Sequence, residues 1–306
     1  MVTMTMADIW VGSSTMPDTD SAPLLVIGAT GQIGEYVLAR TQDRPVTAMA
    51  RVPGRLPELN NLQSVAFEAD QGVAPDLEMP RQAIATIPVW LLAPLVDQLS
   101  DHGVQRLVCF STTSVLGKAD TSTPHEKAVV ERVRDAEQRL QDRSHTNDMA
   151  LTILRPTMIY GTGRDRTVAA AGRFIRRFGV YPLYGEALGA RQPVHADDLA
   201  AAAISALNNP QTHGHTYALG GSETLSYRDM IARIFAVLER SPRMINVPGL
   251  PQILAFAGSV IPGSELSADV ARRMNHDLAF DDGTAGADFG YEPRSFLFGG
   301  VQDLFG

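Results

Sequence analysis

Glycines at positions 28, 31 and 34 follow a short apolar run, Leu24–Ile27, and stand at the start of a helical apolar stripe. Gly28 permits a tight turn, Gly31 lets a ligand approach the backbone, and Gly34 lets the helix pack close to the strand. Free main-chain N–H groups at a helix start attract anions. The alternative is an ordinary strand–turn–helix corner. We expect the paired phosphates of a dinucleotide to bind here, at Gly28, Thr30, Gly31, Gln32, Ile33 and Gly34.

Two arginines, Arg51 and Arg55, follow the next apolar run, Val46–Ala50. At this position of a dinucleotide-binding fold, an acidic residue bonds the adenosine ribose and a basic residue accommodates a 2′-phosphate. A guanidinium holds phosphate through two charge-assisted hydrogen bonds. The sequence therefore favours NADP(H) over NAD(H), with a solvated loop arginine as the alternative.

Short apolar strands alternate with helical patterns through the first half of the chain. This alternation predicts an α/β fold, a doubly wound parallel (Rossmann) sheet with helices on both faces. Ligands of such sheets bind beyond the carboxyl ends of the strands. The predicted strands are Leu24–Ile27, Val46–Ala50, Ser64–Glu68, Ala83–Thr86, Arg106–Phe110 and Leu151–Arg155, with Thr216–Leu219 following later.

The alternation loosens into glycine-rich loops past residue 156, with helical stretches near 167–178 and 227–238. We expect a smaller C-terminal substrate lobe there. The predicted division is a disordered leader at 1–22, a dinucleotide-binding domain at 23–156 plus about 194–240, and the lobe at about 157–193 and 241–306.

Composition limits the classes of protein to which the chain can belong. Of 306 residues, 44% are hydrophobic and 20% charged, enough for a sizeable core, and the net charge of -8 argues against nucleic-acid binding. No uninterrupted apolar stretch is long enough to cross a bilayer. The single cysteine, Cys109, lies in an apolar run and predicts a buried strand residue in a reducing compartment, the cytoplasm. No spacing of His, Cys and carboxylates predicts a metal site.

Several further motifs, in this order, make the chain resemble the extended, or atypical, branch of the short-chain dehydrogenase/reductase superfamily, which includes nucleotide-sugar epimerases and dehydratases. The resemblance runs from about Leu24 to Leu238 and weakens beyond it. The motifs that carry it are the segment 28–34, Phe110-Ser111-Thr112-Thr113-Ser114-Val115, Lys127 with Glu131, Leu154-Arg155-Pro156 with Tyr160-Gly161, and Val194-His195-Ala196-Asp197-Asp198-Leu199-Ala200.

The resemblance assigns roles to residues near the predicted cofactor. It implies that Asp70 bonds the adenine amino group and that Lys127 binds the nicotinamide ribose and lowers the pKa of a catalytic tyrosine. That tyrosine position falls on Thr123. A threonine hydroxyl is far too weak an acid to replace a phenol of pKa about 10.

Thr123 has a structural explanation, because Thr123-Pro124-His125-Glu126 reads as a capping box with proline at the first helical position. His125 is a candidate substitute acid, since an imidazole titrates near neutrality. A solvated histidine in the first helical turn is the alternative. Thr112 best matches the hydroxyl that orients substrate in relatives, with Ser111 and Thr113 as near alternatives; all three could instead bond backbone at a strand end.

For the substrate, the resemblance implies contacts at Arg191, which matches a diphosphate-binding arginine, and at Tyr160. The expected function is an NAD(P)-dependent epimerase, dehydratase or reductase acting on a nucleotide sugar or a small carbonyl compound. The alternative is a catalytically silent NADP(H)-binding regulatory or assembly protein. Relatives often form homodimers through helices flanking the active site, and the stretch 128–140 is a candidate, although a core-facing helix shows the same apolar stripe.

Overall fold

The computed structural model describes residues 22–73, 77–117, 124–260, 268–281 and 283–306. Its centre is a parallel sheet of seven strands in the order β11-β6-β5-β4-β1-β2-β3. The order reverses between β1 and β4, where the crevice of a doubly wound fold opens. The strands are β1 (Leu24–Ile27), β2 (Val46–Ala50), β3 (Leu62–Ala66), β4 (Gln82–Ala85), β5 (Arg106–Phe110), β6 (Ala150–Pro156) and β11 (Thr216–Leu219).

The predicted parallel sheet is confirmed, and four of the strands have the predicted bounds: β1, β2, β5 and β11. The third strand begins two residues earlier than predicted, at Leu62. The apolar pattern is a poor guide there because β3 is an edge strand in which three of the five residues are exposed.

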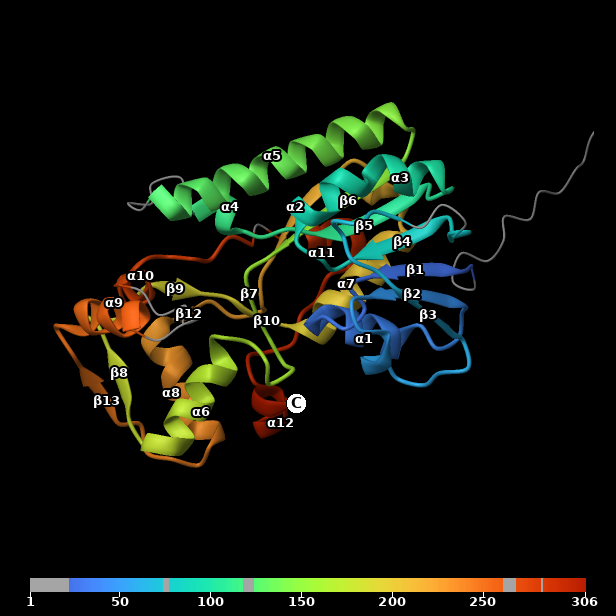
Figure 1. Cartoon of the computed structure of the whole chain (residues 1–306). Helices are drawn as coiled ribbons and strands as arrows, with labels where there is room; N and C mark the ends of the chain where they lie inside the picture. The colour runs from blue at the N-terminus through green and yellow to red at the C-terminus, as the bar shows by residue number, and fades with distance from the viewer. Residues whose placement is uncertain (1–21, 74–76, 118–123, 261–267, 282) are drawn as a thin grey trace, which may run out of the picture.

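Helices cover both faces of the sheet, as Figure 1 shows. Leu24 and Val26 face a core with α1 and α7, whereas Leu25 and Ile27 face a second core with α2, α3 and α5. Successive side chains of a strand point to opposite faces of the sheet, so each strand contributes side chains to both cores. These helices are α1 (Gln32–Arg40), α7 (Ala196–Asn208), α2 (Val89–Leu92), α3 (Val96–Asp101) and α5 (Pro124–Thr146); α4 (Ser114–Gly117) precedes α5.

The apolar stripe of α5 packs into its own chain. Val133, Ala136 and Leu140 belong to the second core, so the stripe that was one candidate for dimerisation faces the sheet. Cys109 is also fully buried there, which confirms the predicted strand position.

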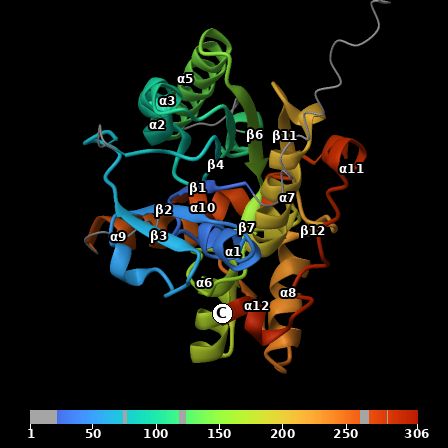
Figure 2. The same cartoon turned by 90° about the vertical axis from the view of Figure 1, so that its right-hand side faces the viewer.

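A third hydrophobic core lies to one side of the sheet and defines what we call the lobe (Figures 1 and 2). Met230 and Phe235 of the helix at 227–237 pack there, whereas the sequence assigned that helix to the sheet domain. The lobe contains β8 (Tyr181–Leu183), α6 (Val168–Phe178), β12 (Leu225–Ser226), α8 (Tyr227–Val237), β13 (Met244–Asn246), α9 (Leu250–Val260), α10 (Ala268–Arg272) and α12 (Val301–Phe305).

Short strands and one late helix connect the lobe to the sheet. β7 (Met158–Tyr160) pairs with β10 (Pro193–His195), and β9 (Ala190–Arg191) pairs with β12. α11 (Thr284–Phe289) returns to the first core, where Phe289 packs against Tyr217. The lobe core is therefore built from several separate segments between residues 158 and 305. The predicted domain boundaries stay a prediction.

Candidate functional site

The glycine turn between β1 and α1 is as tight as its sequence suggests. Gly28 has φ +86°, and its N–H donates to Met49 O across the sheet at 2.9 Å. A Cβ added to Gly34 would lie 2.6 Å from Gly28 O and 2.8 Å from Ala29 Cα, closer than real side chains come. Gly31 is the N-cap of α1 and offers no capping side chain, so the first-turn amides have no partner within the helix.

A cavity of about 700 Å³ opens beside this turn, at the carboxyl ends of β1 to β4. We call it the sheet-edge cavity. Five residues predicted to bind the cofactor line it, brought together from three separate loops, together with Thr86, whose hydroxyl donates to Gly28 O at 2.8 Å. The five are Gly28, Thr30, Gly31, Arg51 and Asp70.

The other predicted cofactor residues lie around the cavity without lining it. Gln32 accepts a hydrogen bond from the Thr162 hydroxyl at 2.8 Å, and Ile33 packs in the first core. Lys127 is exposed in the first turn of α5. Its predicted contact with the nicotinamide ribose therefore stays a prediction.

Three hydroxyls follow β5, and the structure gives each a different environment. Thr113 is buried and donates to Pro156 O at 3.1 Å, while Thr112 accepts from the Ser114 amide at 3.1 Å at the start of α4. The Ser111 hydroxyl is buried and has no partner in the described part of the chain. An unpaired buried hydroxyl is costly, so Ser111 is the one of the three whose hydrogen-bonding capacity the described residues leave unused.

Neither the residue at the usual tyrosine position nor the candidate substitute acid can be placed in the structure. Thr123 lies outside the described residues, as does the side chain of His125. Glu126, the next residue, pairs with Arg273 at 2.6 Å and so connects the start of α5 to the lobe. The Lys127 end of α5 is therefore held beside the lobe, as seen in Figure 1.

Arg191 lies inside the lobe wall, with only 2% of its surface exposed. Its Nη1 donates to Ala190 O and His276 O, both at 2.8 Å, and its Nη2 donates to Arg273 O. The guanidinium also lies over the Tyr227 ring, 5.2 Å from the centroid. Burial lowers its pKa to about 10. Its Nε has no partner among the described residues.

A second cavity, of about 420 Å³, opens in the lobe beside Arg191, and we call it the lobe cavity. The sequence did not predict it, because its walls come from seven separate segments with no shared motif. Eleven of its lining residues are apolar, and the polar ones are Arg166, Thr167, Tyr181, Arg191, Tyr227 and Arg273. The hydroxyls of Tyr181 and Tyr227 bond each other at 2.9 Å.

Tyr160, the other predicted substrate contact, is fully buried. Its hydroxyl accepts a hydrogen bond from the Leu297 amide at 3.1 Å, and its ring packs edge-on against His195 and Phe296. Desolvation raises its pKa. Tyr160 lines neither the sheet-edge nor the lobe cavity, so substrate contact there stays a prediction without geometric support.

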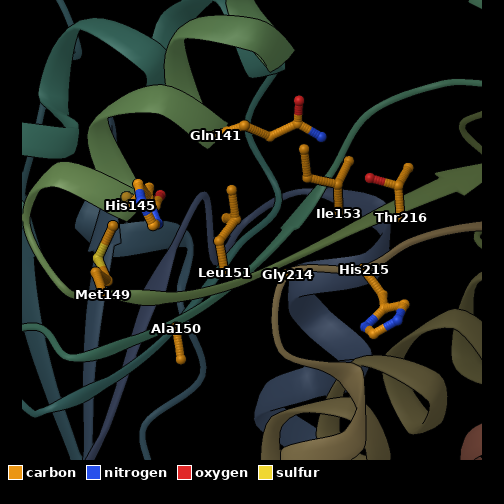
Figure 3. A pocket seen from close by; sticks show the side chains of 10 residues that line it. Gln141, His145, Met149, Ala150, Leu151, Ile153, Gly214, His215 and Thr216 are labelled. Carbon is orange, nitrogen blue, oxygen red and sulfur yellow. The ribbon is translucent and has the colours of Figure 1, made fainter.

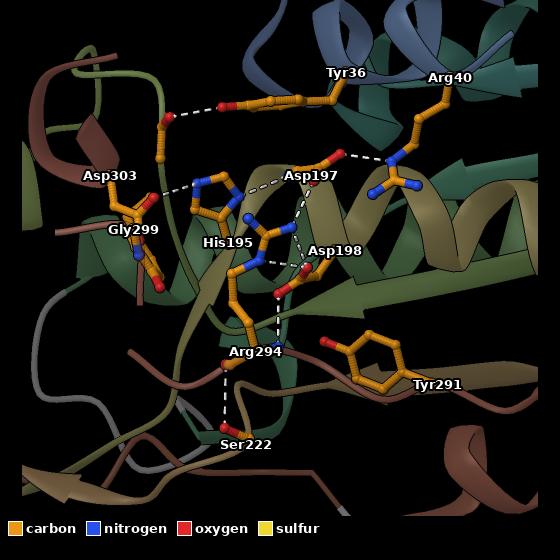
Figure 4. A network of polar contacts seen from close by, with 12 residues as sticks. Tyr36, Arg40, His195, Asp197, Asp198, Ser222, Tyr291, Arg294, Gly299 and Asp303 are labelled. Carbon is orange, nitrogen blue, oxygen red and sulfur yellow. Dashed lines mark hydrogen bonds and ion pairs between the residues drawn. The ribbon is translucent and has the colours of Figure 1, made fainter. Parts of the chain in front are cut away.

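A polar network joins the lobe to the sheet helices (Figure 4). His195 Nδ1 accepts from the Asp197 amide at 3.1 Å, which leaves Nε2 to face Asp303 at 3.5 Å. Arg294 bonds both Asp198, at 2.7 Å, and Asp197, at 2.5 Å. The sequence analysis found His195, Asp197 and Asp198 only as part of a motif, because their partners Asp303 and Arg294 lie about a hundred residues downstream.

Another cavity, of about 300 Å³, lies at the opposite end of the sheet, at the amino ends of β6 and β11 and the last turns of α5 (Figure 3). Ligands of doubly wound sheets bind at the carboxyl ends, so this cavity is not part of the candidate site. In the described ranges, no three or more His, Cys, Asp or Glu side chains gather as a metal site. Nor is any described helix long and apolar enough to span a membrane.

Comparison with curated proteins gives relatives of different kinds. Subunit 9 of the NADH dehydrogenase [ubiquinone] 1 alpha subcomplex of Arabidopsis thaliana is 32% identical over 98 residues, 32% of this chain and only 24% of that protein. The (4-alkanoyl-5-oxo-2,5-dihydrofuran-3-yl)methyl phosphate reductase of Streptomyces griseus is 30% identical over 232 residues, 72% of this chain and 75% of the relative. An NAD(P)H azoreductase of Xenophilus azovorans is 25% identical over 277 residues, 86% and 89%.

Solved structures share the fold over nearly the whole chain. An epimerase from Methanothermobacter thermautotrophicus has a TM-score of 0.71 at 15% identity, covering 94% of this chain and 91% of that one. A dTDP-glucose 4,6-dehydratase from Streptomyces venezuelae, solved with NAD and TYD bound, has a TM-score of 0.67 at 18% identity, covering 92% and 94%. The model of the NAD dependent epimerase/dehydratase family matches residues 69–220. The chain therefore belongs to the NAD dependent epimerase/dehydratase family.

Proposed function

We propose that the chain binds NADP(H) in the sheet-edge cavity and acts as an oxidoreductase or epimerase on a nucleotide sugar or a small carbonyl compound. The observation that carries the proposal is the lining of this cavity. Residues from the loops after β1, β2 and β3 converge there. The sequence analysis predicted that the first loop binds the paired phosphates, the second the 2′-phosphate and the third the adenine. Family membership and the NAD-bound dehydratase structure support the same cofactor class.

The residues that line the cavity fit a dinucleotide. A Cβ would come within 3.0 Å of other atoms at Gly28 and Gly34 and would be tight at Gly31, and the uncapped start of α1 offers main-chain N–H groups that suit paired phosphates. Arg51 would hold the 2′-phosphate that separates NADPH from NADH, and Asp70 the adenine amino group. When bound, the nicotinamide supplies or accepts a hydride.

In this proposal Lys127 holds the nicotinamide ribose, and a hydroxyl after β5 orients the substrate oxygen. Thr112 matches that hydroxyl by sequence, and the unpaired Ser111 is its neighbour. His125 would move the proton that the absent tyrosine moves in relatives. The reductase and azoreductase relatives favour reduction of a carbonyl or related group over sugar epimerisation.

The second candidate is a protein that keeps NADP(H) for structure or sensing and has lost turnover. Threonine at position 123, where relatives with oxidoreductase chemistry carry tyrosine, favours it, because no strong phenolic acid is supplied. The relative from the NADH dehydrogenase complex favours it too. Both candidates predict the same cofactor binding.

Cofactor binding is tested first, by following NADPH fluorescence as purified protein is added. Gly34→Ala should abolish binding, since the new Cβ meets backbone atoms that cannot move aside. Gly249→Ala is the matched control, because nothing lies within 4 Å of its Cβ position. Wild-type protein that binds neither NADPH nor NADH at millimolar concentration would refute both candidates.

Cofactor preference is tested at Arg51. Arg51→Ala should weaken NADPH more than NADH by about 1.5–3 kcal/mol, the scale of hydrogen bonds to charged groups. Equal losses for both cofactors would remove Arg51 from 2′-phosphate recognition.

Turnover separates the two candidates. Nucleotide sugars and carbonyl compounds are screened for oxidation of bound NADPH. Once a substrate is found, Lys127→Ala should lower both cofactor binding and rate, while His125→Ala should lower rate alone. Tight binding without turnover on any compound supports the silent protein.

A further inference from the structure

The lobe cavity has a chemical character that a nucleotide sugar does not match. Ribose and hexose hydroxyls that leave water need hydrogen-bonding partners, or each costs free energy. Eleven of the cavity's lining residues are apolar, and the described lining contains no carboxylate, amide or imidazole. The two tyrosine hydroxyls in its wall already bond each other. Met158, Phe174, Leu254 and Met274 instead offer surface for a hydrocarbon body.

One part of the cavity wall carries positive charge. Arg191 is buried and contacts three backbone carbonyls and a ring, but no carboxylate among the described residues. Arg273, also in the wall, shares its charge with Glu126 at 2.6 Å. A desolvated guanidinium without an ionic partner is costly, and an anion beside it offsets that cost. The Nε of Arg191 also has no partner among the described residues, so the guanidinium keeps one unused hydrogen-bond donor.

The position of the cavity connects it to the proposed chemistry. Arg273 lines the cavity and holds Glu126, the residue before Lys127. Met158, also in the wall, lies two residues beyond Pro156, whose carbonyl accepts from Thr113. The cavity wall is therefore connected, through Arg273 and through the strand that contains Met158, to both elements that carry the proposed catalytic residues.

From this combination we infer that the lobe cavity binds a compound with an alkyl or aryl body and a single anionic group, which lies against Arg191. Binding of this compound does not depend on the proposed function. Only the statement that the compound is the substrate rests on the proposed function. It narrows the substrate class to apolar acids or monophosphates bearing a reducible group. Nucleotide sugars are then not the substrate.

Binding to the cavity is tested by calorimetry with decanoate, decyl phosphate, decanol and UDP-glucose as probes, without cofactor. We expect both anions to bind at one site at least tenfold more tightly than decanol, and UDP-glucose not to bind. Affinity should rise about fourfold for each methylene from hexanoate to decanoate, as buried CH₂ groups predict. UDP-glucose binding more tightly than decanoate, or decanol matching it, would overturn the inference.

Variants then locate the site. Ala170→Trp fills the cavity from α6 and should lower decanoate affinity at least tenfold, whereas Ala236→Trp, on the exposed side of α8, should leave it unchanged. Arg191→Met should remove the preference for decanoate over decanol, and exposed Arg177→Met is the charge-matched control. If Arg191→Met does not fold, the Ala170→Trp result decides alone. Equal decanoate affinity in Ala170→Trp and wild type would refute the assignment.

The NADPH titration keeps the two proposals separable. Decanoate binding that is lost in Ala170→Trp, in a protein that does not bind NADPH, sinks the proposed function and leaves the cavity assignment standing. If the protein binds NADPH but none of the cavity probes, the cavity assignment fails and the proposed function stands.

Discussion

Arg106 under the sheet and Arg191 in the lobe are both buried, and neither contacts a carboxylate among the described residues. Arg106, at the start of β5, donates from all three nitrogens to Leu207 O, Leu107 O, Ala150 O, Ala206 O and the hydroxyls of Thr152 and Thr212. Arg191 makes three such bonds and leaves Nε unpaired beside a cavity. Burial lowers the pKa of both to about 10.

The difference separates a structural cation from a candidate ligand-binding one. Ala206 O and Leu207 O belong to the last turn of α7, where carbonyls lack helical partners and a cation is favourable. Arg106 therefore completes the junction of a helix end and two strands. Arg191 performs a similar function for the loop around His276, but its Nε has no partner among the described residues, and Arg191 lines the lobe cavity.

The largest expected effect is that of Arg106→Met. It leaves several carbonyls and two threonine hydroxyls unpaired under the sheet, where water does not reach, and should lower the free energy of unfolding by about 4 kcal/mol. Urea denaturation measures the loss. A loss below about 1 kcal/mol would mean that the bonds of Arg106 are not needed, and the contrast between the two arginines would fail.

Arg191→Met should cost less, about 2 kcal/mol, because it strands three carbonyls beside a cavity from which water can solvate them. The same denaturation experiment applies. A saturating cavity ligand should stabilise wild type but not the variant, since a ligand stabilises only the state that binds it. A loss equal to that of Arg106→Met would indicate that Arg191 is purely structural.

The polar network around Asp303, which joins the lobe to the sheet helices, should stabilise the protein less in acid. Desolvation opposes ionisation of Asp303, but the bonds from His195 and the Gly299 amide outweigh it and hold the carboxyl pKa below its ordinary value. A lowered folded-state pKa stabilises the protein above the ordinary value, near 4, and this stabilisation is lost as pH falls through the folded pKa.

Asp303→Asn should therefore lower the free energy of unfolding by about 1–2 kcal/mol at pH 7. It should also flatten the fall in stability of wild type between about pH 5 and pH 2. Thermal melts across that range measure both effects. Asp269→Asn, which removes an exposed pair within α10, is the control. An unchanged acid profile in Asp303→Asn would place the acid sensitivity elsewhere.

The sequence predicted the sheet well because each buried strand is a continuous apolar run bounded by turn residues. Arg106–Phe110 is fully buried at every residue, and its bounds were predicted correctly. The strand was predicted correctly although it begins with a charged residue. Nothing in the local sequence, however, indicated that Arg106 itself is buried. Apart from Leu107, its partners lie 44 to 106 residues away in the sequence.

The candidate site divides in the same way. Gly28, Thr30, Gly31, Arg51 and Asp70 were found because strand ends converge at one edge of a parallel sheet, a rule that needs no contact information. The lobe cavity was missed because its walls come from β7, α6, β8, β9, α8, α9 and α10, and only folding brings them together. Arg191 was selected by resemblance, whereas its carbonyl partners were not visible in the sequence.

The smallest expected effect tests whether exposed charge also holds the lobe to the sheet. Glu35 of α1 pairs with Arg164, which lies between β7 and α6, at 2.6 Å, but the two side chains are 43% and 50% exposed. Glu35→Gln should lower the free energy of unfolding by no more than about 0.5 kcal/mol, and the loss should vanish in 1 M salt, where charges are screened beyond about 3 Å. A loss above about 1 kcal/mol that persists in salt would mean that this pair, and not the buried network around Asp303, supports the joint.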